Sequence, residues 1–190
     1  MDAQVNQTTD HDLMTEVARG NLASMSEIYR HRHRSLFRFF FRMTGKQATA
    51  EDLVHEVFLR MIRYRHTYQT GDGFEAWMYR IARNAFADQT KKHRLEVPAE
   101  EGLFDLTAEA RPSAFEQVSK KQDLALLYRA LRELPEDKRE LIILSRFQGL
   151  SCEQIGELMG AAQGTVKVRV FRAMKEMGKI FLDLQKEKAS

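Results

Sequence analysis

The stretch from Leu150 to Lys175 constrains the fold of this 190-residue chain more than any other segment. Ser151 is the expected N-cap of a short helix, and Gln154, three residues later, completes a capping box. Gly160 and Gly164 mark a turn, after which a second helical pattern begins. Two helices around such a tight turn predict a helix-turn-helix, in which the second helix enters the major groove of DNA.

The second of these helices has two opposite faces. One face is apolar and suits a core: Val166, Val170, Ala173 and Met177. The other face combines cations with apolar groups: Lys167, Val168, Phe171, Arg172 and Lys175. A basic helix face is often only solvated, but solvated faces seldom expose Val168 and Phe171 beside three cations. Apolar side chains on a reading helix can instead contact thymine methyl groups.

The rest of the chain also reads as helical, because no segment alternates with the period of a strand. Helices are expected over residues 10–20 (capped by Asp10 or Asp12), 23–44, 50–64, 74–92, 114–134 and, after Pro135, up to about Phe147. The predicted fold class is therefore all-α, with two small helical domains.

Charge divides the chain into three parts. Residues 1–94 carry a net charge of +4 and residues 120–190 also carry +4, whereas residues 95–119 carry −5. Two prolines and a glycine fall in the same acidic stretch. We therefore expect domains at residues 1–94 and 114–190, joined by a flexible acidic linker at residues 95–113. Two basic blocks around an acidic one suggest two modules that face nucleic acid.

Cysteine usage and hydropathy indicate a cytoplasmic protein. Cys152 is the single cysteine, so no internal disulfide can form, and we interpret it as a small residue in a capping turn. The polar N-terminus is unlike a signal peptide. No apolar run is long enough to cross a bilayer, so membrane insertion is not expected.

Two helices of the first domain carry further candidate residues. The helix expected at 50–64 has a wide apolar stripe, with Asp52, His55 and Glu56 left outside it. In the helix expected at 74–92, aromatic residues and arginines alternate around Asn84. Rings, guanidinium planes and an amide suit unstacked bases, although the aromatic rings could equally complete a core. The loop around His66, Tyr68 and Gln69 has the same composition.

Signals for catalysis are weak. The chain has no phosphate-binding loop, no nucleophile elbow and no zinc-protease motif. Its six histidines and one cysteine do not have the spacing of a zinc site. We expect no catalytic residue, no metal and no cofactor, hence a protein that is not an enzyme.

Three blocks of the sequence resemble the sigma-70 family of bacterial sigma factors, specifically the small extracytoplasmic-function type. They are AEDLVHEVFLRMIRY (residues 50–64), FEAWMYRIARNAFAD (74–88) and LPEDKRELIILSRFQGLSCEQIGELMGAAQGTVKVRVFRAMKEM (134–177). They occur in the order and spacing of that family, which makes the resemblance specific. The helix-turn-helix alone would be less specific, because LuxR-type regulators carry a similar string.

The resemblance implies an alternative sigma factor that binds core RNA polymerase and directs initiation at particular promoters. The first domain (sigma region 2) would dock on the β′ clamp helices and capture the −10 element as single-stranded DNA. The second domain (sigma region 4) would bind the −35 element as duplex and contact the β flap. An anti-sigma factor would be a further partner. The acidic linker would thread the polymerase channels near the path of nascent RNA.

Site residues follow from the resemblance by position. Core polymerase binding falls on Asp52, His55 and Glu56, where many members have Gln in place of His55. Binding of −10 DNA falls on His66, Tyr68, Gln69, Tyr79, Arg80, Arg83 and Asn84. Binding of −35 DNA falls on Lys167, Val168, Arg169, Phe171, Arg172 and Lys175. Arg169 lies on the flank and is expected at a phosphate, and Val168 stands where Ser is commoner, which allows a different −35 sequence.

Two other functions remain open at this point. One is a sigma-like partner-switching decoy that binds an anti-sigma protein but no DNA, which predicts degraded base-reading faces. The other is an unrelated helix-turn-helix protein, either a regulator or an enzyme such as a recombinase. Run-off transcription with purified core polymerase discriminates among the three.

Overall fold

The computed structural model describes residues 9–69, 73–96 and 114–189. Every regular element in this part of the chain is helical, which confirms the predicted all-α class. The described residues divide into two compact units, the first within Met1–Arg38 and Ala50–Pro98 and the second within Phe39–Thr49 and Ala99–Ser190. The two units are described separately below.

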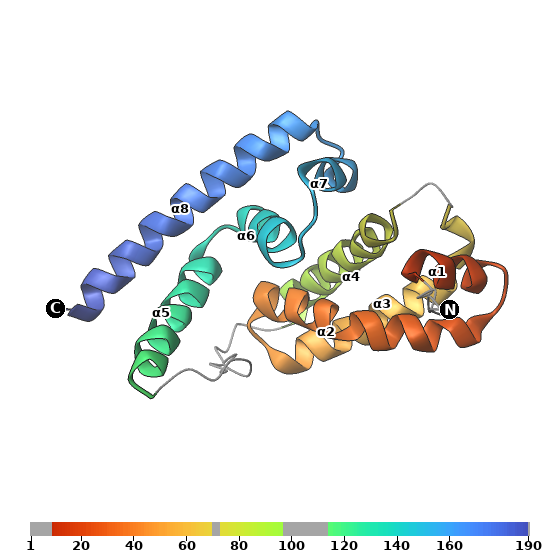
Figure 1. Cartoon of the computed structure of the whole chain (residues 1–190), viewed down its shortest axis with the longest axis horizontal. Coiled ribbons are helices and arrows are strands. Elements are labelled where there is room, and N and C mark those ends of the chain that lie inside the picture. Colours follow the sequence, from red (N-terminus) through yellow and green to blue (C-terminus); the bar gives the residue numbers. More distant parts are fainter. Residues whose placement is uncertain (1–8, 70–72, 97–113, 190) are drawn as a thin grey trace, which may run out of the picture. The chain divides into compact units, whose positions relative to one another are not determined.

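The first unit contains α1 (Asp10–Ala18), a short 3-10 turn η1 (Leu22–Ser24), α2 (Met25–Thr44) as far as Arg38, α3 (Gln47–Arg63) from Ala50 onward, a second 3-10 turn η2 (Arg65–Thr67) and α4 (Phe74–Glu96) (Figure 1). The end of α2 and the start of α3 belong to the second unit. Its core contains side chains that are at most 1% exposed: Met14, Ile28, Leu36, Leu53, Met61 and Met78. The apolar stripe predicted for the third helix is buried at Leu53, Val54, Val57, Phe58 and Met61.

The cap of α1 differs from the prediction. Thr9, and not Asp10 or Asp12, is the N-cap, and Asp12 is its capping-box partner. The Asp12 backbone N–H donates to the Thr9 hydroxyl at 3.2 Å, and the Thr9 backbone N–H donates to the Asp12 carboxylate at 3.0 Å. The Asp12 carboxylate also accepts a hydrogen bond from the Thr9 hydroxyl at 2.7 Å, and this bond, together with the one from the Thr9 backbone N–H, lowers the pKa of Asp12. A threonine three residues before an acid satisfies two otherwise unpaired donors, which a lone aspartate does not.

The second unit contains α5 (Ala114–Glu133), α6 (Glu136–Ile142), a π-helical segment η3 (Ile143–Phe147), α7 (Cys152–Met159) and α8 (Gln163–Ala189). In Figure 1, α8 is the longest helix, and α5, α6 and α7 all pack against it. The expected helix up to Phe147 therefore changes geometry at Ile143. Helix α4 continues to Glu96, two residues into the predicted linker, and residues 97–113 lie outside the described residues.

The helix-turn-helix forms as predicted, except that Gly164 lies in the first turn of α8 and not in the turn before it. Two other positions, Gly160 and Gly156, shape the turn. Ser151 and Gln154 make the expected capping box at the start of α7. Gly160 ends α7 in the left-handed region with φ of 63°. At Gly156, a Cβ atom would lie 2.5 Å from the carbonyl oxygen of Ala161, so only glycine lets the turn pass this close to α7.

Candidate functional site

The reading face of α8 lies opposite a fully buried stripe. Val166, Val170, Ala173 and Met177 are at most 7% exposed, as the helical spacing predicted. On the other side, Val168 is 48% exposed and Phe171 is 70% exposed. The cations on this face and its flanks are exposed as well: Lys167, Arg169, Arg172 and Lys175. None of these four side chains forms an ion pair with another described residue.

This arrangement favours a polyanionic partner. Four cations without an acidic partner in the described part of the chain leave a strongly positive surface. Val168 and Phe171 stand between them at a spacing of three residues, which places them on one side of the helix. A major groove offers what both kinds of group need, with phosphates at its rims and methyl groups and base edges on its floor.

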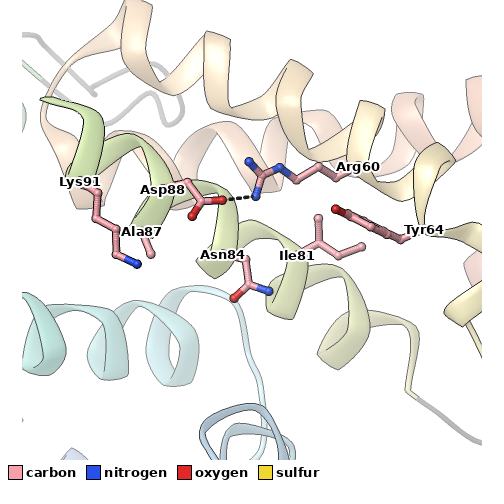
Figure 2. Close-up of a pocket in the computed structure, with 7 residues that line it drawn as sticks. All are labelled: Arg60, Tyr64, Ile81, Asn84, Ala87, Asp88 and Lys91. Carbon is pink, nitrogen blue, oxygen red and sulfur yellow. Dashed lines mark hydrogen bonds and ion pairs between the residues drawn. The ribbon is translucent and has the colours of Figure 1, made fainter.

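A second candidate site is a pocket of about 350 Å³ between α3 and α4. Figure 2 shows Arg60 and Tyr64 reaching it from the α3 side and the remaining lining residues reaching it from α4. Those from α4 are Ile81, Asn84, Ala87, Asp88 and Lys91. The volume is at the lower end of the range for small-ligand pockets, about 300–1,000 Å³. A ring, an aliphatic wall and an amide together suit a planar heterocycle of the size of a nucleobase.

An ion pair forms one side of this pocket. Arg60 Nη1 lies 2.8 Å from Asp88 Oδ2, and Arg60 Nε lies 2.6 Å from Glu56 Oε1. Burial lowers the pKa of the Arg60 guanidinium, but hydrogen bonds to Glu56 and Asp88 more than offset this effect, so its pKa lies above the ordinary value. The cation is thus fixed in place, while Asn84 beside it is exposed and able to donate and accept hydrogen bonds.

The residues predicted to bind −10 DNA divide into exposed and buried sets. Arg80, Asn84, His66 and Gln69 are exposed, and Arg83 is half-buried. Tyr79 is 2% exposed and Tyr68 is 7% exposed, so neither ring is open to a base. In the first turns of α4 the core covers more of the helix surface than the sequence predicts, and Tyr79 lies in this additional buried part. Tyr68 packs edge-on against Trp77, with ring centroids 5.1 Å apart.

The outer face of α3 presents the predicted acids, His55 and an exposed leucine that the helical pattern does not single out. Asp52 and His55 are exposed, and Glu56 is 43% exposed despite its contact with Arg60. Leu59 lies among them and is 61% exposed. In the sequence, Leu59 could have been found as an apolar residue that lies outside the apolar stripe of α3. An exposed leucine beside acids suits a protein partner better than a polyanion.

The described residues contain no group of three or more His, Cys, Asp or Glu side chains able to hold a metal ion. None of the described helices has the length and apolar content required to span a membrane.

Comparison with known proteins identifies the protein family to which each of the two units is similar. Sigma-70 region 2 matches residues 28–96, and sigma-70 region 4 matches residues 124–177. The extracytoplasmic-function sigma factor SigE of Mycolicibacterium smegmatis is 34% identical over 158 residues, covering 82% of this chain and 61% of SigE. EcfG of Rhodopseudomonas palustris is 34% identical over 143 residues, covering 75% of this chain and 77% of EcfG.

A solved structure supports the same family assignment. The sigma factor RpoE of Bartonella quintana, crystallised with the anti-sigma factor NepR, is 26% identical with a TM-score of 0.67, covering 82% of this chain and 94% of RpoE. The fold is that of a sigma-70-type protein. The chain belongs to the extracytoplasmic-function group of that family, the alternative sigma factors of bacterial RNA polymerase.

Proposed function

We propose that this chain binds core RNA polymerase and directs initiation at promoters that it selects through a −10 and a −35 element. The observation that carries the proposal is the outer face of α8, where four cations and two apolar side chains are exposed in a helix-turn-helix. A partner-switching decoy would have no use for that face. A recombinase would need a catalytic domain where residues 28–96 match sigma region 2.

Docking on the polymerase is assigned to the outer face of α3. Asp52, His55 and Glu56 would contact the β′ clamp helices, and Leu59 would add an apolar contact at the centre of the same face. A central apolar residue ringed by polar ones is the usual make-up of an interaction hot spot. The charge of Asp52 has no ion-pair partner among the described residues, so it is available to a cationic surface.

Capture of the −10 element is assigned to the pocket between α3 and α4 and to the exposed side chains near it. A base unpaired from duplex DNA would enter beside Tyr64 and Ile81 and present its edge to Asn84. Arg80, one turn before Asn84 on the same face of α4, would contact the backbone of the single strand. Arg83, His66 and Gln69 would extend this surface, whereas buried Tyr68 and Tyr79 support it from beneath.

Binding of the −35 element is assigned to α8. Arg172 and Lys167 would contact base edges, Val168 and Phe171 would contact thymine methyl groups, and Arg169 and Lys175 would contact phosphates. The second unit would also contact the β flap. We also propose domain boundaries at residues 94–95 and 113–114, a flexible linker between them and a cytoplasmic location.

An anti-sigma factor is a further proposed partner. RpoE of Bartonella quintana was solved with such a partner, and its structure matches most of this chain. A protein that covers the outer face of α3 would exclude the polymerase, which would switch the chain off without changing it chemically.

Titration of labelled chain with core polymerase tests the docking surface. Asp52→Arg should weaken binding at least about tenfold, because it places a cation against a surface that accepts an acid. Glu51→Arg is the matched control: it makes the same charge change about 100° away around the helix and should leave the affinity near that of the wild type. Equal affinity of Asp52→Arg and wild type would contradict the assignment.

A further inference from the structure

Helix α1 lies outside both family matches, which cover residues 28–96 and 124–177, yet it is joined to the rest of the first unit by more than apolar packing. The Asp10 carboxylate is only 10% exposed and accepts hydrogen bonds from two consecutive side chains of α2. His31 Nδ1 lies 2.7 Å from Asp10 Oδ1, and Arg32 Nε contacts Asp10 Oδ2. A largely covered carboxylate with both oxygens paired fixes the N-terminal end of α1 to α2.

Arg32 also contacts two residues at the start of α4, Phe74 and Glu75. Its Nη2 lies 2.5 Å from Glu75 Oε1, and its guanidinium carbon lies 5.4 Å from the centroid of the Phe74 ring. Burial lowers the pKa of Arg32, but its contacts with Asp10 and Glu75 outweigh that effect and leave the pKa above its ordinary value. The arginine is therefore a permanent cation between two acids from different helices.

His11 makes the second connection, to the segment after η2. His11 Nδ1 lies 2.5 Å from the Tyr68 hydroxyl, and the two rings are 5.6 Å apart. Tyr68 is 7% exposed and packs edge-on against both Trp77 and Phe74. Because Tyr68 is buried, its hydroxyl needs a hydrogen-bond partner, and His11 supplies one from a helix 57 residues away in sequence.

A series of contacts also links Tyr68 to the pocket between α3 and α4. Trp77, against which Tyr68 packs, has its indole N–H 3.4 Å from the Thr67 hydroxyl. That hydroxyl donates in turn to the carbonyl oxygen of Tyr64 at 2.7 Å. Tyr64 lines the pocket between α3 and α4. Thus Asp10 and His11 together fix the two chain segments, Tyr64–Tyr68 and the start of α4, that support the pocket and the exposed groups near it.

We propose that Asp10 and His11 are positioning residues for capture of single-stranded promoter DNA: α1 holds the −10-binding surface in its binding geometry. The proposal rests on the function proposed above for that surface. A surface that is already ordered binds without first losing the conformational freedom of its side chains and loops. Loss of the His11–Tyr68 hydrogen bond costs about 1 kcal/mol, which corresponds to about a fivefold loss in affinity if it acts on the binding-competent geometry.

The test measures binding of holoenzyme to a fluorescent single strand that carries the −10 sequence selected by the wild-type protein. His11→Ala and Tyr68→Phe should each weaken binding about three- to tenfold. The double variant should be little worse than either single one, because both remove the same hydrogen bond. His11→Gln, which keeps a hydrogen-bonding group, should recover part of the affinity. Binding to core polymerase and to −35 duplex should not change in any of these variants.

Ser24→Ala is the matched control for loss of stability. The Ser24 hydroxyl donates to the Glu16 carboxylate, so the substitution loosens the opposite end of α1 without touching Tyr68. It should lower the melting temperature but leave capture of the single strand unchanged. Equal loss of capture in Ser24→Ala and His11→Ala would overturn the proposal, as would additive effects of His11→Ala and Tyr68→Phe. Failure of the wild-type holoenzyme to bind any single strand would instead contradict the −10 assignment itself, and the positioning role with it.

Discussion

Single residues on α8 are assigned different tasks at the −35 element, and two arginines separate them. Arg172 lies on the outward side with Val168 and is expected at a guanine, whereas Arg169 lies toward the flank and is expected at a phosphate. Arg172→Ala should cost about 1–3 kcal/mol and relax the preference at one base position. Arg169→Ala should weaken binding to all sequences and reduce the salt slope by about one.

Selection of binding sites from a randomised library distinguishes the two arginine variants. If both lose affinity uniformly and retain the same preferred sequence, Arg172 is a phosphate contact and the assigned reading face is rotated.

Val168 and Phe171 give a second prediction at the residue scale. Replacing thymine by deoxyuridine removes one methyl group and leaves base pairing unchanged. At base pairs that face these side chains, the replacement should weaken −35 binding about fourfold, the equivalent of one buried CH₂ group. Val168→Ser and Phe171→Ala should each abolish this sensitivity at one position, as measured by titration of substituted duplexes. If both variants still bound the deoxyuridine duplex more weakly than the thymine duplex, contact of Val168 and Phe171 with thymine methyl groups would be excluded.

At the scale of single elements, the helix-turn-helix depends on the close approach of Gly156 to Ala161. Gly156→Ala places a methyl group 2.5 Å from a backbone oxygen that cannot move without opening the turn. It should destabilise the second unit by about 1–3 kcal/mol. Gly178→Ala is the matched control, because nothing lies within 4 Å of the added Cβ in α8, and it should stabilise the helix by up to about 1 kcal/mol.

Urea unfolding of the full chain, followed by circular dichroism, compares the two glycine variants. Similar stabilities for Gly156→Ala and Gly178→Ala would show that the turn tolerates a side chain at this position.

The elements also show what the sequence could predict. The two faces of α8 and the capping box of α7 are local features, encoded within a few residues, and both were predicted. The cap of α1 was assigned to the wrong residue because Asp10, Asp12 and Thr9 are all good caps, and only the backbone decides between them. Tyrosine occurs both in cores and at binding surfaces, so the sequence alone does not distinguish the buried Tyr68 and Tyr79 from DNA contacts.

What the sequence could not predict depends on contacts between helices. The pocket between α3 and α4 needs both helices in place, and so does the Arg60–Asp88 pair that closes one side of it. The contact of His11 with Tyr68 joins residues 57 apart, and no periodicity relates them. Leu59 was overlooked because a helical pattern identifies a buried stripe more readily than a single apolar residue outside it.

At the scale of the whole molecule, initiation requires both units to act on one promoter while the chain is bound to polymerase. The two proposed DNA-binding surfaces lie on separate units and share no residue, so changes to them should act independently. Asn84→Ala should reduce formation of the open complex on duplex promoter, and a premelted promoter should restore part of the loss because unpairing is no longer needed. Equal impairment of this variant on both templates, or none on either, would contradict a role for Asn84 in capture of the unpaired base.

The most direct test of the central claim is run-off transcription from a promoter library with purified core polymerase and this chain. We predict new start sites that share one −10 and one −35 sequence and depend on added chain. Arg172→Ala should change only the shared −35 sequence, and Asn84→Ala only the use of the −10 sequence. Binding of the chain to core polymerase without any new start site would contradict a role in initiation, and so would one variant that altered both elements together.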